Sequence, residues 1–476
     1  MLRVCAREGP LARGGRPPRV RSMRILHTAD WHLGHTLRDH SRAAEHAHFL
    51  RWLVDTVVER RVDALLIAGD VFDAANPPPT ALRAWFQFLG DLKRRAPAVM
   101  VVVIAGNHDS AARLEAPREL LAAFDVRVVG AIERRADGTL DVEPLLVPLR
   151  GADGSTALCV AIPFLRASDV LALVPPSVSP PNRENVARAG DYVLPRPGEP
   201  ASEPTLAQAP DVDPLLAGMR TLHAELFAAA RARQRPGEAL LAMAHGYLVG
   251  GALSELSERK VLGGNQHALP LDLFPAECAY VALGHLHRPQ RLAGHEHVRY
   301  SGSPIPLSMP ERLHAHHVVV CDLDGSVVAK VWSLRVPRLV PLLRLPEHGE
   351  FAPDEALAAI AALPPRDPAT ADELRPLVEV AVRLPVPSPQ LGERIARAIA
   401  DREARLVRVE VVLTGDGGAA DPAAREACVR PADLASWTPE QVFLRRYHRD
   451  HSEAPPPELL RAFRELLEQV QHEGPA

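Results

Sequence analysis

The stretch MRILHTAD at residues 23–30 reads as a buried strand that ends on an acidic residue, and the pattern returns as ALLIAGD at 64–70 and VMVVVIAGNHD at 99–109. Between these strands, residues 41–60 and 80–95 carry apolar side chains at helical spacing. Strand, helix and strand in this alternation predict right-handed βαβ units and an α/β layered fold.

Further along, short strands are expected at 126–129, 145–149 and 157–162, and a helix at 214–233. Strands at 240–246, 278–287 and 316–323 are expected to complete a second sheet-forming half, so the core domain ends near residue 336. Residues 175–214 are rich in proline and lack periodicity, which predicts a loop or linker.

The two ends of the chain differ in character from this core. Residues 1–22 are rich in Arg, Gly and Pro and read as a disordered extension or an upstream start, with a basic targeting segment as the alternative. After residue 339, a strand at 374–384, a helix at 390–402 and a strand at 406–413 predict a small α/β domain. The last part predicts two helices, and the final one, at 458–471, places its apolar residues on one face.

Composition limits the classes of function. The 476 residues are 47% hydrophobic and 24% charged, which is typical of a globular protein of several domains. A formal charge of −4 excludes a strongly basic field over the whole protein, so any contact with nucleic acid must be local. The five cysteines form no CxxC pair, which argues against a disulfide scaffold and favours a reducing, cytoplasmic location. No apolar run is long enough for a membrane span.

Five short polar motifs follow the expected strands in order. Open α/β sheets build their sites beyond the carboxyl ends of strands, so these motifs are expected to meet. Carboxylate, amide and imidazole groups together suit divalent metal ions. The candidate metal ligands are Asp30, His32, Asp70, Asn107, His245, His285 and His287. Each motif alone is more often a turn or a solvated pair, so the prediction rests on the ordered set of five.

This ligand set points to phosphoester hydrolysis. Two divalent cations bring four positive charges, and the carboxylates of Asp30 and Asp70 cancel two of them. The two positive charges that remain can be balanced by a phosphate oxygen and a hydroxide. His108 follows the ligand Asn107 and is expected to meet the leaving oxygen. Asp109 is expected to hold the His108 ring in one tautomer.

At this point a family resemblance can be stated. The segments MRILHTADWHLG, GDVFDAANPP, GNHDS, YVALGHLHRPQ and RYSGSPIPLSMPE resemble the calcineurin-like metallophosphoesterases and, within them, the bacterial SbcD family of nuclease subunits. The resemblance implies a two-sheet αββα nuclease domain over residues 23–336, with 175–214 as an insertion. It further implies a small α/β capping domain over 337–430 and a helical tail over 431–476.

The resemblance also implies roles for the ligands. Asp30, His32, Asp70 and His287 would hold one metal ion, and Asp70, Asn107, His245 and His285 the other, with His108 as the catalytic histidine. The working metal would be Mn²⁺. Archaeal and eukaryotic relatives have a second active-site histidine three residues after the bridging aspartate. This chain has Asp73 at that position.

The implied activity is DNA cleavage in exonuclease and endonuclease modes, in DNA repair, recombination and replication. The implied assembly pairs the chain with an SbcC-like ATPase, held by the C-terminal helices, and with a second copy of itself, held by helix 41–60 or 80–95. On general grounds the final helix would instead pack on its own domain.

Two rival functions share these residues. One is a stand-alone metallophosphoesterase acting on small phosphodiesters or phosphoproteins, against which the long region after residue 336 and the GSPIP stretch speak. The other is a non-catalytic scaffold of the same fold, which would be expected to have lost ligands, and none is lost in this sequence.

Overall fold

A computed structural model describes residues 23–166, 169–170, 214–248, 269–292, 294–386 and 388–414, together with 443–444, 447, 455–456, 459–460 and 463. The N-terminal extension, nearly all of the proline-rich segment and most of the tail lie outside the described residues. The chain divides into two compact units, of which the first holds 1–259, 265–382 and 389–411, and the second holds 260–264, 383–388 and 412–476.

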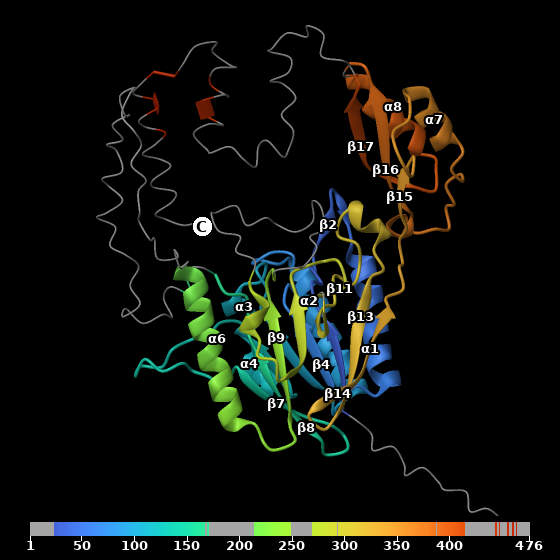
Figure 1. The fold of residues 1–476 in the computed structure, drawn as a ribbon. Helices are drawn as coiled ribbons and strands as arrows, with labels where there is room; N and C mark the ends of the chain where they lie inside the picture. The colour runs from blue at the N-terminus through green and yellow to red at the C-terminus, as the bar shows by residue number, and fades with distance from the viewer. Residues whose placement is uncertain are drawn as a thin grey trace, which may run out of the picture. The chain divides into compact units, whose positions relative to one another are not determined.

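The first sheet contains the βαβ units that the sequence predicts (Figure 1). Its strand order is β14-β13-β1-β4-β5-β6. The strands β1, β4, β5 and β6 run parallel to one another. β13 pairs antiparallel with β1, and β14 pairs antiparallel with β13. The strands are β1 (Met23–Thr28), β4 (Ala64–Ala68), β5 (Met100–Ile104), β6 (Val126–Val129), β13 (His317–Asp324) and β14 (Val327–Arg335). The crossover helices α1 (Ala43–Arg60) and α2 (Pro79–Arg95) begin within two residues of the predicted positions.

One strand was assigned to the wrong sheet. We expected residues 316–323 to complete the second sheet, but β13 pairs with β1 in the first sheet, with Met23 opposite Leu323 and His27 opposite Val319. Because every residue of β1 except Arg24 is buried, the backbone groups on both edges of the strand need hydrogen-bond partners. β4 pairs with one edge, and β13 pairs with the other.

The second sheet has the order β11-β12-β10-β9-β8-β7. Its central neighbours run parallel, and the two edge strands β7 and β11 run antiparallel to the strands beside them. The strands are β7 (Leu146–Arg150), β8 (Thr156–Ala161), β9 (Ala239–His245), β10 (Cys278–Gly284), β11 (Gln290–Leu292) and β12 (His295–Tyr300).

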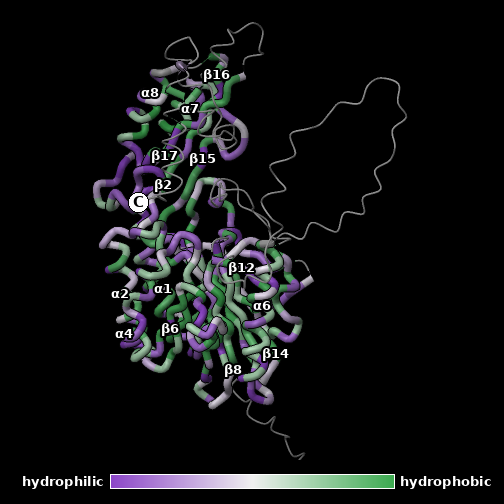
Figure 2. Tube along the Cα trace, turned by 90° about the vertical axis from the view of Figure 1, so that its left-hand side faces the viewer, coloured by the Kyte–Doolittle hydropathy of each residue, from purple (hydrophilic) through white to green (hydrophobic). Residues whose placement is uncertain are grey.

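Alternating side chains divide the core into layers. Ile25 and Leu66 belong to a cluster that includes the second sheet, whereas their neighbours Leu26 and Leu65 pack with α1 and α2. The helix α6 (Pro214–Arg233) contributes Phe227 to the first of these clusters and lies beside the second sheet (Figure 1). Figure 2 shows the hydrophobic residues concentrated along the strands of these sheets. The predicted αββα architecture is confirmed.

A third sheet follows the core in the chain, in the order β15-β16-β17, with β15 and β16 parallel. It consists of β15 (Leu342–Leu345), β16 (Leu377–Leu384) and β17 (Arg405–Leu413), with the helices α7 (Pro353–Ala361) and α8 (Pro389–Ile399). The remaining elements are short: β2 (Thr36–Leu37), β3 (His40–Ser41), α3 (Ala111–Glu115), α4 (Arg118–Ala122), η3 (Leu271–Leu273), η4 (Pro310–Leu313) and η5 (Asp372–Leu374). The expected boundaries between nuclease domain, capping domain and tail stay a prediction.

Candidate metal centre

The five polar motifs lie at the carboxyl ends of strands from both large sheets. Asp30 and His32 follow β1, Asp70 follows β4, and Asn107 follows β5. From the second sheet, His245 ends β9, and His285 and His287 follow β10. Two hydrogen bonds join the sheets at this place: the backbone N–H of His285 donates to Asp30 Oδ1 at 2.8 Å, and His245 Nδ1 lies 2.8 Å from the carbonyl oxygen of Ala68. The motifs therefore come together as the sequence predicts.

Asp70 lies at the centre of the cluster. Its Oδ2 atom is 3.5 Å from His32 Nε2 and 3.5 Å from His245 Nε2. Ligand atoms of His32, Asp70 and His108 lie within 4.8 Å of one another, and so do those of Asp30, Asp70 and His245. Asp70 alone belongs to both groups, which is the arrangement that a carboxylate bridging two cations requires.

Asn107 supplies the amide oxygen of the predicted ligand set and lies close to two of the histidines. Its Oδ1 atom lies 3.0 Å from His245 Nε2 and 2.9 Å from His285 Nδ1. The rings of His245 and His285 are 5.4 Å apart, and those of His32 and His287 are 5.0 Å apart. The four imidazoles therefore form two pairs of neighbouring rings.

Three of the rings are oriented by an acceptor at Nδ1. His245 Nδ1 faces the carbonyl of Ala68, His32 Nδ1 lies 3.2 Å from Asp73 Oδ1, and His287 Nδ1 lies 3.2 Å from Glu311 Oε1. A proton on Nδ1 leaves the lone pair of Nε2 free to bind a metal ion. These contacts thus hold three imidazoles in the tautomer that a metal site needs.

Asp73 and Glu311 were not among the predicted site residues. Asp73 lies three positions after Asp70, and Glu311 ends the segment RYSGSPIPLSMPE, whose resemblance to the family was noted without a role for the carboxylate. Glu311 is fully buried and also accepts a hydrogen bond from the backbone N–H of Leu307 at 2.8 Å. A buried carboxylate beside a candidate ligand histidine is the signal that could have found it.

The backbone around the ligands is strained. Asp30, His32, Asp70 and His285 have positive φ angles of 55°, 48°, 48° and 104°, which residues other than glycine rarely adopt. Such conformations cost free energy and persist where the surrounding structure enforces them, often at functional sites. Glycines allow the close approach of the two sheets here, since a Cβ atom on Gly284 would lie 1.9 Å from the carbonyl oxygen of Ala68.

Burial and neighbouring charges shift the pKa values of the carboxylates and imidazoles in the cluster. Burial, opposed by the nearby His245 and His287 and reinforced by Asp70, raises the pKa of Asp30 to about 7. Burial also opposes ionisation of Asp70, but the rings of His245 and His32 outweigh it and hold the pKa of Asp70 well below its usual range. Burial would lower the pKa of His245, yet Asp70 and Asp30 raise it to about 9. Burial lowers the pKa of His32 to about 4 and that of His285 to about 3, so these two rings favour the neutral form that binds a metal ion.

Two unpartnered atoms test whether metal ions fit these residues. Among the described residues, six side-chain N or O atoms are buried without a hydrogen-bond partner, and two of them, Asp30 Oδ2 and His32 Nε2, lie in this cluster. Buried polar atoms without a partner are rare because desolvation is costly. Both atoms belong to predicted ligands, and a cation would satisfy them. The donor set fits divalent metal ions.

The expected contact between Asp109 and His108 was wrong. The carboxylate of Asp109 instead accepts hydrogen bonds from the backbone N–H groups of Gly106, Val71 and Phe72, at 2.9 to 3.1 Å. His108 Nδ1 lies 2.8 Å from the carbonyl oxygen of Asp73. Asp109 directly follows His108 but points into the turns, because these buried N–H groups need an acceptor.

Comparison with known proteins gives the family. The model of the calcineurin-like phosphoesterases matches residues 23–289, and that of the type 5 capsule protein repressor C-terminal domain, SbcD_C, matches residues 338–451. The SbcD protein of the SbcCD nuclease from Rhodobacter capsulatus is 39% identical over 426 residues, which cover 88% of this chain and 93% of that protein. This chain belongs to the SbcD family.

Other members are more distant. The SbcD protein of the SbcCD nuclease from Escherichia coli K12 is 34% identical over 67% of this chain and 70% of its own length. That of Bacillus subtilis is 32% identical over 63% and 66%. Membership in the SbcD family places the chain among metal-dependent phosphodiesterases and nucleases and implies that it binds divalent metal ions. Within the described part of the chain, no helix is both long and apolar enough to cross a bilayer.

Proposed function

We propose that this protein is the DNA nuclease subunit of an SbcCD-type complex and hydrolyses DNA phosphodiesters at a two-metal site. The observation that carries the proposal is the position of Asp70, whose carboxylate belongs to both groups of candidate ligand atoms. By the family resemblance, Asp30, His32, Asp70 and His287 would hold one Mn²⁺ ion, and Asp70, Asn107, His245 and His285 the second. The ligand atoms of Asp30 also lie close to those of His245, so Asp30 is within reach of both sets. Two such ions polarise a phosphoryl oxygen and lower the pKa of an attacking water.

The residues of the chain set the charge of the site and the orientation of its histidines. Asp30 and Asp70 are its anionic ligands, so two divalent ions leave a net positive charge that attracts a DNA phosphate. The tautomers of His32, His245 and His287 are held by Asp73, Ala68 and Glu311 respectively. These contacts fix the ligands before the substrate binds, which lowers the cost of reorganisation during the reaction.

His108 is the proposed general acid. Its Nδ1 atom faces the carbonyl of Asp73 at 2.8 Å, so Nε2 is the nitrogen left to exchange a proton with the leaving oxygen. The backbone N–H of His108 donates to Asp70 Oδ1 at 2.8 Å, which ties the position of the ring to the bridging carboxylate. Asp109 is a positioning residue, because it binds the turns that carry Asp70 and Asn107.

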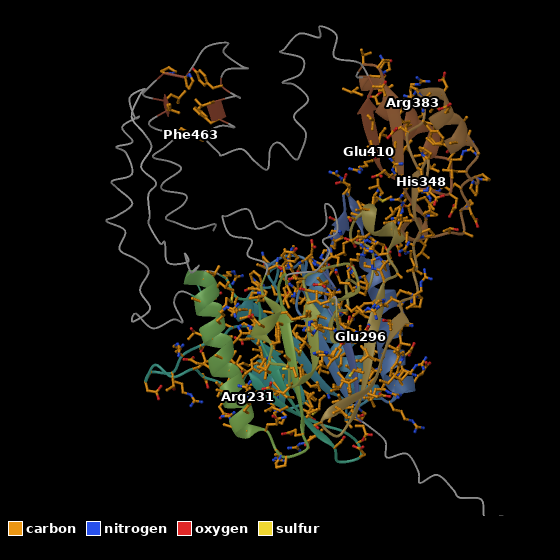
Figure 3. The ribbon with its side chains drawn as sticks, viewed as in Figure 1. Arg231, Glu296, His348, Arg383, Glu410 and Phe463 are labelled. Atoms are coloured by element: carbon orange, nitrogen blue, oxygen red, sulfur yellow. The ribbon has the colours of Figure 1, made fainter. Side chains whose placement is uncertain are left out.

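The proposed partner is an SbcC-like ATPase, held by the C-terminal helices. Within the described residues of this tail, Phe443 and Phe463 stack with their ring centroids 4.1 Å apart, and Figure 3 marks Phe463. Leu459 leaves 41% of its surface exposed on the same tail. An aromatic pair and an exposed leucine support a tail that offers an apolar face. Of the other residues expected on that face, Leu460 is described and half-buried, and Leu466, Leu467 and Val470 lie outside the described part of the chain.

The finer features of the proposal rest on the family. They are double-strand exonuclease and single-strand or hairpin endonuclease modes, a homodimer within a heterotetramer, and a place in DNA repair, recombination and replication in the cytoplasm. The buried free thiols of Cys159, Cys278 and Cys321 support a reducing compartment.

Degradation of linear duplex DNA with Mn²⁺ tests the function, with and without an SbcC-like partner and ATP. We expect His108→Ala to lower the rate about 10²- to 10⁴-fold, as loss of a general acid does, without loss of bound Mn²⁺. His348→Ala is the matched control, since it removes an exposed imidazole from the loop between β15 and α7 (Figure 3). Undiminished cleavage by His108→Ala would refute the role of His108. Hydrolysis of small phosphodiesters without any DNA degradation would favour the stand-alone phosphoesterase.

Deletion of residues from Thr438 onward tests the partner. We expect the shortened chain to lose co-purification with an SbcC-like ATPase and to keep Mn²⁺-dependent hydrolysis of bis-p-nitrophenyl phosphate. Retained co-purification would contradict the docking role of the tail.

A further inference from the structure

We propose that His35 is a positioning residue that fixes the distance between the metal ligands His32 and His287. The inference rests on the proposed function, since it concerns the ion that these two residues would share. His32 follows β1 of the first sheet and His287 follows β10 of the second, so the pair must be held in register across two separate sheets.

The His35 ring lies between two acceptor oxygens. Nδ1 lies 3.0 Å from Asp73 Oδ1, and Nε2 lies 2.9 Å from the carbonyl oxygen of Leu307. A neutral imidazole donates to one of these oxygens, and an imidazolium donates to both. The side chain is 19% exposed, and its backbone N–H donates to the carbonyl of His32 at 2.9 Å. The ring therefore contacts Asp73 on one side and Leu307 on the other.

One end of this bridge leads directly to His32. The same Oδ1 atom of Asp73 that faces His35 lies 3.2 Å from His32 Nδ1. The backbone N–H of Asp73 donates to the carbonyl of Leu33 at 3.2 Å, so Asp73 is anchored to the segment that carries His32. His35 therefore holds the carboxylate that orients His32.

The other end leads to His287 through residues 303–311. The N–H of Leu307, whose carbonyl receives His35, donates to Glu311 Oε2 at 2.8 Å. Glu311 Oε1 faces His287 Nδ1 at 3.2 Å, and the N–H of Ser303 donates to the carbonyl of His287 at 3.1 Å. This segment thus receives His35 at Leu307 and holds His287 at both of its ends.

The consequence concerns metal affinity. His35 contacts Asp73 and Leu307, and Leu307 donates to Glu311, so the ring links both carboxylates that orient the ligand pair. The N–H of His285, which donates to Asp30, and Arg42, which donates to the carbonyl of Pro306, also join these parts of the chain. Metal sites need their ligands held within about 0.5 Å of the productive geometry. Without His35 the two carboxylates are no longer linked to each other by this ring, so the ion that His32 and His287 share should bind more weakly. The ion held by Asn107, His245 and His285 does not depend on this ring and should be unaffected.

Mn²⁺ binding to the full chain tests the inference, measured by calorimetric titration and by the electron paramagnetic resonance of bound Mn²⁺. For His35→Ala we expect about 10-fold weaker binding at one of two sites, the lower end of what loss of an orienting residue costs, with the other site unchanged. His35→Gln should give an intermediate loss, because its amide still offers N–H donors but its flexible side chain does not span the two acceptors as the rigid ring does. The control His48→Ala removes an imidazole from α1 and should bind as wild type does.

The outcomes separate the inference from the proposed function. If wild type binds two Mn²⁺ ions and His35→Ala binds both of them equally well, the inference is overturned and the proposed function is not. A wild type without a pair of Mn²⁺ sites would overturn both. A general structural role predicts a lower metal-free unfolding temperature and weakening of both sites, which would also overturn the inference. If His35→Ala fails to fold, His35→Gln decides: selective weakening of one site supports the inference, and wild-type binding overturns it.

Discussion

Asp70 Oδ2 lies 3.5 Å from Nε2 of His245, although the two residues approach each other from different sheets. Asp70 follows β4 in the first sheet, and His245 ends β9 in the second. The contact therefore depends on how closely the carboxyl ends of these strands approach. Glycine at the ends of neighbouring strands makes that approach possible, which leads to a prediction on stability.

Replacing Gly284 by alanine should destabilise the metal-free protein strongly. The new Cβ atom would lie 1.9 Å from the carbonyl oxygen of Ala68 and 2.8 Å from His245 Nδ1, so the two sheets would have to move apart. We expect a loss of about 3 kcal/mol or more in the free energy of unfolding, measured in urea. At Gly90 in α2 the added Cβ meets nothing within 4 Å, and Gly90→Ala should stabilise by about 0.5–1 kcal/mol. Equal stability of the two variants would contradict the close approach.

Glu311→Gln should weaken Mn²⁺ binding without unfolding the protein. The variant keeps the shape of the side chain but loses the charge that faces His287 and replaces one of the two acceptor oxygens. Loss of such a partner costs about 10- to 100-fold in metal affinity. Glu296→Gln changes an exposed carboxylate on β12 (Figure 3) and serves as the control. Equal affinities in a Mn²⁺ titration would show that Glu311 does not support the site.

The stability of the metal-free protein should fall at alkaline pH. The pKa of His245 is about 9 in the folded state, against an ordinary value of 6.5, so the folded state binds this proton more tightly than the unfolded state does. The stabilisation is fully present below pH 6.5 and is lost as the pH rises through 9. We expect about 1–3 kcal/mol to be lost over this range.

His245→Asn isolates this contribution, because the variant has no imidazole to titrate. Chemical unfolding of both proteins across the alkaline range should show a steeper decline for wild type. With Mn²⁺ bound the extra decline should disappear, since the metal requires a neutral imidazole. Parallel pH profiles of wild type and variant without metal would contradict the predicted coupling.

The sequence predicted which residues gather at the site better than it predicted the contacts around them. Strand-end motifs such as Gly69-Asp70 and Gly284-His285 are visible because parallel neighbouring strands must present their carboxyl ends at one edge. The place of β13 was missed because an apolar strand carries no mark of the sheet that it joins. Hydrogen-bond partners such as Asp73 and Glu311 were missed because loop geometry, rather than spacing, brings them to His32 and His287.

Asp109 illustrates the same limit. Its position directly after His108 suggested contact between the two side chains, yet neighbouring residues on a turn point in different directions. The need of buried N–H groups for an acceptor decided its orientation.

The central claim is that Asp70 bridges two metal ions. Anomalous X-ray scattering from crystals grown with Mn²⁺ tests it most directly, because the signal locates each manganese ion. We predict two peaks about 3.5–4 Å apart, with the carboxylate of Asp70 between them, His32 and His287 beside one peak, and His245 and His285 beside the other. A single peak, or two peaks of which only one lies against Asp70, would contradict the account.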